Sequence, residues 1–516
     1  MRYEDNSVYN SITETVKDRL PALFFVFSRG KTELIAEELS HDWDFLKPAE
    51  KKTVQQIVAD FEKQNPTAFE RKNRRLLKRL LSRGIGYHHA GLSPVLKNLV
   101  ETLYERRLIY ALCCTETFAA GVNFPACSTI FDSCRKWDGK TFRGLLNREF
   151  FQMAGRAGRR GFDEKGYVFV RIDEQYPEQT TFFDEDEVES VNSHLTISPN
   201  TALNLLQWKT DAEIEHFLTN NFAVYQGKKE ERAVNIDIEA ITAEIENLEQ
   251  HFCEERDTRT CALYRKKLKK ELYKHYRRRK NNPDYQSKID EIKEILDLPA
   301  RDCAHSLCFS AKRNLGKLVS ERKRLNRQRE KLAGQHENYF DKFSSVCSLL
   351  EQLGYIEGRI LLPRGIFASK IHIQEILVTE LIFSGIMSDA TPAEIAAIIV
   401  GIDYEANRRD KMIPNVVDLS KVEELHRELQ KSNVPLHFCS WSPIPGPLAY
   451  LWHEGKSFGS LLEMTEMQEG DIFSMLRREI DLLRQIESAL KDDPALQAKI
   501  RGVRLSLDRD EVSVSF

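Results

Sequence analysis

Short, uninterrupted apolar runs recur in the first third of the chain and constrain its fold more than any other feature. They cover residues 21–27, 108–114, 129–131 and 167–170. Runs of this kind, without polar alternation, are typical of strands that are buried on both faces, as in a parallel sheet. The segments between them favour helices. Alternating strands and helices predict a doubly wound α/β domain over residues 1–187.

The remainder of the chain has a mainly helical pattern. Residues 188–230 are helical with a few apolar positions. Residues 231–338 carry dense charge, which predicts two helices that fold back on each other as an antiparallel arm. Residues 339–516 are globular and again mostly helical, except that residues 503–514 predict a short hairpin.

Hydropathy argues against a membrane protein. No apolar run approaches the roughly 18 residues needed to span a bilayer. The N-terminus lacks the apolar stretch of a signal peptide. The ten cysteines are therefore expected to be reduced thiols rather than a disulfide framework. We predict a cytoplasmic protein that makes no membrane contact.

Residues 152–161 (QMAGRAGRRG) carry the strongest chemical signal. Gln152, Arg156 and Arg159 follow the spacing i, i+4 and i+7, so on a helix they form one stripe. Planar guanidinium groups suit a triphosphate, because the transferring phosphoryl group needs positive charge placed in advance. The glycines remove side chains where another surface must come close. The alternative interpretation is an arginine-rich surface helix.

Two further segments place polar groups at the ends of predicted strands. Residues 113–125 begin at the end of one buried strand, and residues 24–29 end another. The carboxyl ends of parallel strands are where α/β sheets bind ligands. Hydroxyl and backbone N–H groups at such an edge are suited to hold a phosphate.

These segments resemble motifs four, five and six of a superfamily-two helicase. Their combination is similar to the superkiller-type DExH-box helicases, a family that includes exosome-associated RNA helicases. The resemblance rests on residues 27–29, 88–92, 115–123 and 152–161, and, for the family's terminal helical domain, on residues 353–356, 379–385 and 469–486. It covers most of the chain apart from the arm, where only the general architecture matches.

The resemblance implies a fold of four parts. Residues 1–187 would form the second RecA-like lobe of the motor, and residues 188–230 a winged-helix segment. Residues 231–338 would be the helical arm inserted after it. Residues 339–516 would form a helical bundle that contains the ratchet helix.

The resemblance also implies roles for individual residues. Arg156 and Arg159 would be catalytic arginine fingers, and Gln152 would sit at the nucleotide together with Gly121. The residues expected to contact the nucleic-acid strand or line its path are Ser28, Arg29, His88, Gly91, Thr115, Asn123, Arg477, Arg478 and Asp481. For the last three, the alternative is a surface helix with ion pairs.

A member of this family would use ATP and Mg²⁺ to move 3′ to 5′ along single-stranded nucleic acid, with RNA expected ahead of DNA. The P-loop and DExH box of the family's first motor lobe are absent from this sequence. Residues 30–32 (GKT) imitate the end of a P-loop, but Phe25 stands where the motif needs glycine. The chain alone is therefore expected to hydrolyse no ATP and to need a first lobe in cis or in trans.

Two other functions fit the sequence. The chain could be a nucleic-acid-binding module that never contacts ATP, or a fragment of a DNA-repair helicase. Motifs that contact the backbone do not separate RNA from DNA. The presence of Arg156 and Arg159 favours the motor, because a simple clamp needs no contacts to a nucleotide.

The arm generates two further hypotheses. Cys253, Cys261, Cys303 and Cys308, with His305, would be zinc ligands if the two halves of the arm meet, and otherwise small buried apolar groups and a solvated histidine. Basic blocks at residues 265–280 and 312–331 would hold phosphates, or would form a solvated face on which a protein partner docks.

Overall fold

The computed structural model describes most of the chain. The described residues are 6–69, 72–121, 124–159, 161, 163–172, 189, 191–250, 259, 261–279, 285–298, 307–336, 338–406, 410–411, 413–414 and 416–513. They form two compact units: Met1–Val191, Pro199–Leu203 and Leu350–Phe516 make the first, and Asn192–Ser198 and Asn204–Leu349 make the second.

A five-stranded parallel sheet forms the centre of the α/β lobe, which we define as described residues 6–172. Its strands are β1 (Ala22–Phe25), β2 (Ile85–His88), β3 (Ala111–Cys114), β4 (Ser128–Phe131) and β7 (Tyr167–Val170). The order is β2-β3-β1-β4-β7, and every neighbouring pair is parallel. The predicted α/β class is therefore confirmed.

Four of these strands coincide with the four apolar runs, and the fifth, β2, was missed. Its sequence, Ile-Gly-Tyr-His, is no apolar run, yet all four of its residues are buried. Tyr87 is buried because its hydroxyl donates to the carbonyl of Asn73 at 2.8 Å. Such partners are supplied by the tertiary structure, so the residue types alone do not reveal the strand.

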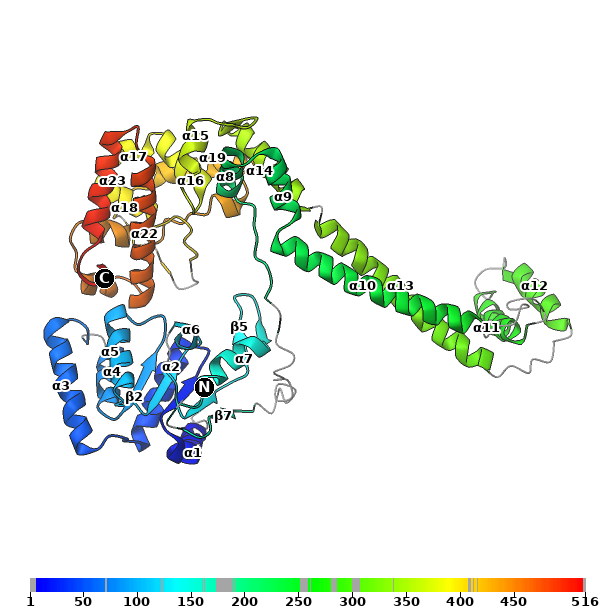
Figure 1. The fold of residues 1–516 in the computed structure, drawn as a ribbon, viewed down its shortest axis with the longest axis horizontal. Helices are drawn as coiled ribbons and strands as arrows, with labels where there is room; N and C mark the ends of the chain where they lie inside the picture. The colour runs from blue at the N-terminus through cyan, green and yellow to red at the C-terminus, as the bar shows by residue number, and fades with distance from the viewer. Residues whose placement is uncertain are drawn as a thin grey trace. The chain divides into compact units, whose positions relative to one another are not determined.

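Helices surround the sheet of the α/β lobe (Figure 1). They are α1 (Asn6–Val16), α2 (Arg29–Asp42), α3 (Pro48–Gln64), α4 (Lys72–Leu81), α5 (Pro94–Glu105), α6 (Thr117–Gly121) and α7 (Asn147–Ala154). Between β4 and α7 the chain forms a two-stranded hairpin from β5 (Arg135–Trp137) and β6 (Phe142–Gly144). The core of the lobe consists of the strand side chains and the apolar faces of these helices.

The second unit contains the predicted arm. Its helices are α9 (Asp211–Thr219), α10 (Phe222–Gln250), α11 (Ala262–Arg279), α12 (Tyr285–Asp297), α13 (Leu307–His336) and most of α14 (Asn338–Gln352). The long helices α10 and α13 lie side by side (Figure 1). At the far end, α11 and α12 pack through Leu268, Ile292 and Ile295. Arg265 reinforces this contact by donating to the carbonyl of Ile295 at 3.0 Å.

The terminal helical domain, defined as residues 350–513, follows the arm. It opens with a small hairpin of β8 (Ile356–Glu357) and β9 (Ile360–Leu361). The helices that follow are α15 (Pro363–Ala368), α16 (Glu375–Phe383), α17 (Ile386–Asp389), α18 (Pro392–Ile399), α19 (Ser420–Lys431), α20 (Gly446–His453), α21 (Phe458–Glu463), α22 (Glu469–Ala489) and α23 (Pro494–Leu507). This mainly helical remainder agrees with the predicted fold class.

Helix α8 (Pro199–Trp208) connects the two units along the chain. Its Asn200 side chain donates to the carbonyls of Ser369 at 2.8 Å and Ile371 at 2.7 Å. Residues 199–203 therefore pack with the terminal helical domain, although the arm separates them in sequence. The predicted domain boundaries after residues 187, 230 and 338 stay predictions.

The hairpin predicted over residues 503–514 is wrong. Helix α23 continues to Leu507, and a short 3₁₀ helix (Asp510–Val512) follows it. Asp493 caps the helix by accepting from the backbone N–H of Leu496 at 3.0 Å. Leu496, Ile500, Val503 and Leu507 are buried at helical spacing. The alternating apolar residues near residue 503, which suggested a strand, are thus the end of the apolar stripe of a helix.

None of the described helices combines the length and apolar character that crossing a membrane would require.

Glu479 lies in the middle of α22 as a buried carboxyl group without a partner. It is 2% exposed, and neither of its oxygens has a hydrogen bond with any described residue. Burial raises the pKa of Glu479 well above its ordinary value. The folded chain therefore keeps a proton on Glu479 at pH values where the unfolded chain has lost it.

We expect Glu479→Gln to stabilise the terminal helical domain at neutral pH. Because the pKa of Glu479 is raised on folding, the wild-type domain loses stability as the pH rises above about 4.5. The advantage of the variant should grow by about 1.4 kcal/mol per pH unit until the folded pKa is reached. Thermal unfolding between pH 4 and pH 8 measures this difference.

Glu487→Gln is the control on the same helix, because the Glu487 carboxylate pairs with Arg504 at 2.8 Å. It should not stabilise the domain at any pH. A pH-independent difference between Glu479→Gln and the wild type would contradict the assignment of a protonated Glu479.

Candidate functional site

The carboxyl ends of the strands gather polar residues from separate parts of the chain. Phe25 of β1 is in register with Cys114 of β3 and with Phe131 of β4. The residues that follow these positions therefore meet at one edge of the sheet, which we call the carboxyl edge. The predicted residues Ser28 and Thr115 lie at this edge.

Hydroxyl groups are available at the carboxyl edge. Ser28 is exposed and caps α2, with its Oγ accepting from the backbone N–H of Lys31 at 3.4 Å. The Oγ1 atoms of Thr115 and Thr117 are 2.9 Å apart. Thr117 is exposed as well. Exposed hydroxyls beside the first turn of a helix are suited to phosphate oxygens, because the helix end adds partial positive charge.

Lys31, from the segment that imitates a P-loop, is engaged in an ion pair at this edge. It lies in the first turn of α2, and its Nζ is 2.8 Å from the Asp132 carboxylate. Asp132 follows β4 and also accepts from Tyr9 at 2.6 Å, with Arg171 at 3.2 Å. Residues 30–32 are helical rather than a phosphate-binding loop, which agrees with the rejection of the P-loop.

The β5–β6 hairpin places two exposed aromatic rings close to this edge, and the motif analysis missed them. Trp137 is 53% and Phe142 65% exposed, and their ring centroids are 5.3 Å apart. Gly139 has a φ of 99° in the turn between them. An Asp-Gly pair flanked by aromatic residues is a hairpin signal that could have found this element. We call Trp137 and Phe142 the aromatic pair.

Glu149 anchors the hairpin to α7. It binds Arg143 through both carboxylate oxygens at 2.8 and 2.9 Å, and Lys136 at 2.9 Å. Burial opposes the charge of Glu149, but these hydrogen bonds and one from the backbone N–H of Leu146 lower its pKa to about 2. The hairpin is therefore held to α7 at every physiological pH.

Arg156 and Arg159 do not lie on the same helix as Gln152, so the predicted helical stripe is wrong. Helix α7 ends at Ala154, and Gly155 follows as its C-cap. The backbone then pairs with the segment that leads into β4: the Ala126 N–H donates to the Arg156 carbonyl at 2.8 Å. Gly158 has a φ of 91°, a conformation that favours glycine and ends helical geometry. Gln152 itself is exposed on α7.

The two arginines lie near the amino ends of β4 and β7. Arg156 donates to the carbonyl of Ala119 in α6. Arg159 makes a bidentate pair with Asp163 at 2.6 and 2.7 Å. Its hydrogen bonds to Asp163 raise the pKa of Arg159, and the same bonds lower the pKa of Asp163. The guanidinium of Arg159 is thus charged and held in one orientation.

The predicted residues therefore separate to opposite edges of the same sheet. Ser28 and Thr115 follow the carboxyl ends, whereas Arg156 and Arg159 lie beside the amino ends. A strand of four residues spans roughly 13 Å. Gly121 ends α6, which leads from one end to the other. Asn123 lies outside the described residues.

Arg29, His88 and Gly91 have structural partners inside the first unit. His88 is buried and its Nε2 is 2.9 Å from Glu101. Arg29 donates to Asp471 at 2.7 Å and to Gln468 at 2.9 Å. Gly91 is also buried and faces Gln468. Their predicted contacts with nucleic acid stay predictions.

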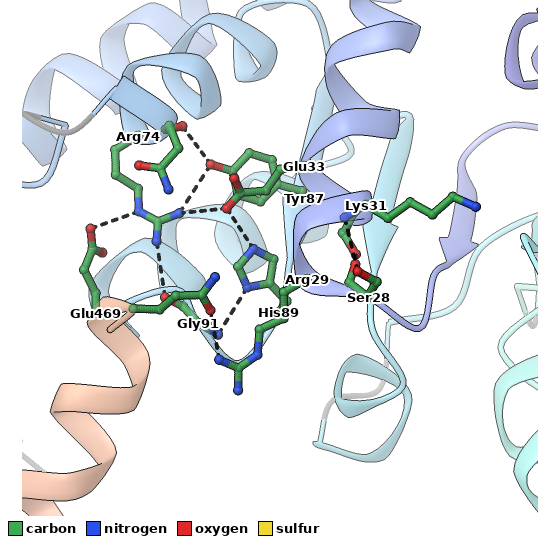
Figure 2. A network of polar contacts seen from close by, with 12 residues as sticks. Ser28, Arg29, Lys31, Glu33, Arg74, Tyr87, His89, Gly91 and Glu469 are labelled. Carbon is green, nitrogen blue, oxygen red and sulfur yellow. Dashed lines mark hydrogen bonds and ion pairs between the residues drawn. The ribbon is translucent and has the colours of Figure 1, made fainter. Parts of the chain in front are cut away.

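Arg74 stands at the centre of a buried polar network (Figure 2). It is 1% exposed and donates to Glu469 at 3.0 Å, to the Gly91 carbonyl at 3.2 Å and to Tyr87 at 3.3 Å. Glu33 lies 3.6 Å from it. Burial opposes its charge, but the carboxylates, Glu469 foremost, raise the pKa of Arg74 above its ordinary value.

His89 completes the network and fixes the loop after β2. Its Nδ1 accepts from the Gly91 N–H at 3.1 Å, so the proton must reside on Nε2, which is 3.1 Å from Glu33. Burial lowers the pKa of His89, despite the opposing effect of Glu33. A neutral histidine with one defined tautomer is therefore built into this loop.

The predicted residues of α22 have different surroundings. Arg477 donates to Asp508 at 3.0 Å and to the Val512 carbonyl at 3.3 Å, inside its own domain. Asp481 is exposed and accepts from Gln485. Arg478 lines a groove together with Arg29, Tyr404 and Asp471. Among the residues that the structure describes, five carboxylates and two arginines line this groove.

The zinc hypothesis gains no support. Cys253, Cys303 and His305 lie outside the described residues, as does the side chain of Cys308. Cys261 is a half-buried free thiol. Within the described ranges no three potential ligands gather closely enough to hold a metal ion.

Two family models match the chain. The helicase conserved C-terminal domain matches residues 30–161, which include most of the α/β lobe. The DSHCT (NUC185) domain matches residues 358–515, which include most of the terminal helical domain.

Known proteins match as well. Superkiller complex protein 2 from human is 35% identical over 48% of this chain and 20% of its own length. Exosome RNA helicase MTR4 from human is 36% identical over 40% of this chain and 20% of its own length. ATP-dependent RNA helicase mtr4 from Schizosaccharomyces pombe is 24% identical over 96% of this chain and 59% of its own length. The chain thus spans less than two thirds of each relative.

The parallel-sheet lobe followed by helical domains, together with the two family matches, places the chain among helicase C-terminal regions. With the matches on both sides of the arm, the family is clear. The chain carries the C-terminal half of a superkiller-type DExH-box helicase.

We expect the aromatic pair to stack on the bases of single-stranded RNA. Trp137→Ala and Phe142→Ala should each weaken binding roughly tenfold, because stacking of a base on an aromatic ring contributes about 1–3 kcal/mol. Fluorescence anisotropy with a labelled single-stranded RNA measures the affinity. Trp208→Ala is the control, since Trp208 is 71% exposed but lies on α8. Equal affinities of all three variants would refute the role of the hairpin.

Proposed function

We propose that the chain is the C-terminal part of an ATP-dependent RNA helicase that moves 3′ to 5′ along single-stranded RNA. One observation carries the proposal: a charged, oriented arginine pair and a hydroxyl-bearing edge lie at opposite ends of one parallel sheet. A lobe of this kind can contact a nucleotide at one edge of its sheet and an RNA strand at the other edge at the same time. The relatives are RNA helicases by name, which supports RNA rather than DNA as the substrate.

At the amino end, Arg156 and Arg159 would face a nucleotide. When bound, ATP and Mg²⁺ would supply a transferable phosphoryl group and positive charge to balance its oxygens. The residues of this chain that fit the nucleotide are the guanidinium donors Arg156 and Arg159, and Gln152 and Gly121 would lie at the nucleotide with them. The P-loop must come from a first motor lobe, in cis or in trans. Asp163 would keep Arg159 oriented before the nucleotide arrives, which lowers the cost of reorganisation.

At the carboxyl edge, Ser28, Thr115 and the aromatic pair would bind RNA. The hydroxyls would bind phosphate oxygens of the RNA backbone, and the rings would stack on the bases. Neither contact depends on the nucleotide sequence of the RNA. Arg478 and Asp481 on α22 would line the path of the strand, as would Asn123. A cytoplasmic location and a protein partner on the arm remain part of the proposal.

The first test concerns Arg159. In a motor rebuilt with its first lobe, Arg159→Ala should lower the kcat of ATP hydrolysis by roughly a hundredfold or more, because the guanidinium stabilises charge that develops in the transition state. RNA affinity should change little. Arg148→Ala is the control, since Arg148 is exposed on α7. Near-normal turnover of Arg159→Ala would remove Arg159 from catalysis.

The second test concerns the chain by itself. We expect no RNA-stimulated ATP hydrolysis by the purified chain, because it offers arginines but no cradle for the β- and γ-phosphates. RNA binding should persist and should weaken steeply with salt. Addition of a first motor lobe should create the ATPase activity. Phosphate release with and without single-stranded RNA measures it. RNA-stimulated release by the chain alone would reveal a nucleotide site in residues 1–516, and no release after addition of the first lobe would favour a non-catalytic binding module.

A further inference from the structure

The first turn of α22 is held against the α/β lobe at two points. Arg74 of α4 binds Glu469 at 3.0 Å, and Arg29 of α2 binds Asp471 at 2.7 Å. A backbone hydrogen bond joins the two parts directly, because the Gly470 N–H donates to the Gly91 carbonyl at 3.2 Å. We call this contact the α22 junction. It joins segments that are almost 400 residues apart in sequence.

The α22 junction leaves no room for side chains at its centre. A Cβ atom on Gly470 would lie 2.0 Å from the Ala90 carbonyl oxygen, and one on Gly91 would lie 1.7 Å from Gln468 Oε1. At Gly470 the obstructing atom belongs to the backbone, so the two backbones approach there as closely as glycine permits, whereas the Gln468 side chain facing Gly91 is flexible.

The two arginines contribute in different ways. Arg74 is buried, and its guanidinium is surrounded by Glu469, Glu33 and the Gly91 carbonyl. Loss of one partner would leave a charge buried and unpaired, which is costly. The Arg29–Asp471 pair is more than a third exposed on both sides. Solvent weakens an exposed pair, so Arg29 can be altered without endangering the fold.

Arg29 also connects α22 to the carboxyl edge of the sheet. It directly follows Ser28, whose hydroxyl caps α2 at this edge. Glu33, one turn further along α2, belongs to the Arg74 network (Figure 2). A displacement of the first turn of α2 would therefore be passed to Asp471 and Glu469.

We propose that Arg74 and Arg29 form a two-point clamp that makes α22 move with the α/β lobe as one body. Arg29 and Arg74 are then positioning residues, which act on RNA through the placement of α22. The consequence for a motor rests on the proposed function, whereas the clamp itself does not. When the α/β lobe moves along the RNA strand, α22 moves with the lobe. The exposed face of α22 then keeps a constant position relative to Ser28 and Thr115.

Hydrogen exchange of the 516-residue chain tests the clamp without nucleotide or RNA. The reporter is the Gly470 amide, whose hydrogen bond crosses the junction. Arg29→Glu places a carboxylate beside Asp471 and should speed exchange in the first turn of α22 by about tenfold or more. The double variant Arg29→Glu with Asp471→Arg restores opposite charges and should recover most of the protection.

Arg79→Ala is the matched control. Arg79 lies on α4, like Arg74, and pairs with Glu37 of α2 at 3.1 Å, but it does not touch α22. Exchange in the first turn of α22 should be unchanged in this variant. Arg74→Lys is the second probe. Lysine keeps the positive charge but lacks the planar guanidinium that donates to several acceptors at once. It should speed exchange as well.

Two outcomes would overturn the clamp. One is wild-type exchange in both Arg29→Glu and Arg74→Lys, and the other is faster exchange in Arg29→Glu that the Asp471→Arg change does not reverse. In a rebuilt motor, Arg29→Glu should lower the duplex unwound per ATP hydrolysed, and the double variant should restore it. Persistent loss in the double variant would mean that Arg29 contacts RNA directly. Failure of the proposed function would be recognised separately, as absence of ATP hydrolysis in the wild-type motor.

Discussion

All five strands of the main sheet run in the same direction, and the rest of the structure depends on that constraint. Parallel strands cannot be joined by tight turns, so each connection crosses a face of the sheet as a helix or loop. Ser28, Thr115 and Asp132 consequently meet at one edge, although they come from distant parts of the chain. Helix α7 leads back across the sheet, so that Arg156 and Arg159 lie at the opposite edge.

Buried charged groups tie together elements that are distant in sequence. Arg74 and Glu469 stabilise the α22 junction, and Asp132 gathers Tyr9, Lys31 and Arg171 around the end of β4. Each group has partners because an unpaired charge in the interior is costly. Glu479 differs, because it lacks partners among the described residues and burial therefore raises its pKa.

Prediction from sequence succeeded where a pattern is local. The apolar runs at residues 21–27 and 108–114 became β1 and β3, and the charged segment after residue 228 became paired helices. Prediction failed where geometry depends on distant contacts. Arg156 left the expected helix because its backbone pairs with Ala126, and Tyr87 is buried because a partner from α4 is available. The exposed aromatic pair was overlooked although an Asp-Gly turn lies between its rings.

The sequence by itself determined the fold class, the family resemblance and the identity of the arginines, because these depend on residue types at short spacings. Only the tertiary structure decided where those residues lie. It placed Arg159 beside the amino ends of β4 and β7 and Thr115 after the carboxyl end of β3, and it gave Arg29 an ion pair with Asp471. The physical reason is that a residue's type sets the interactions it can make, whereas chain topology determines which groups come within reach.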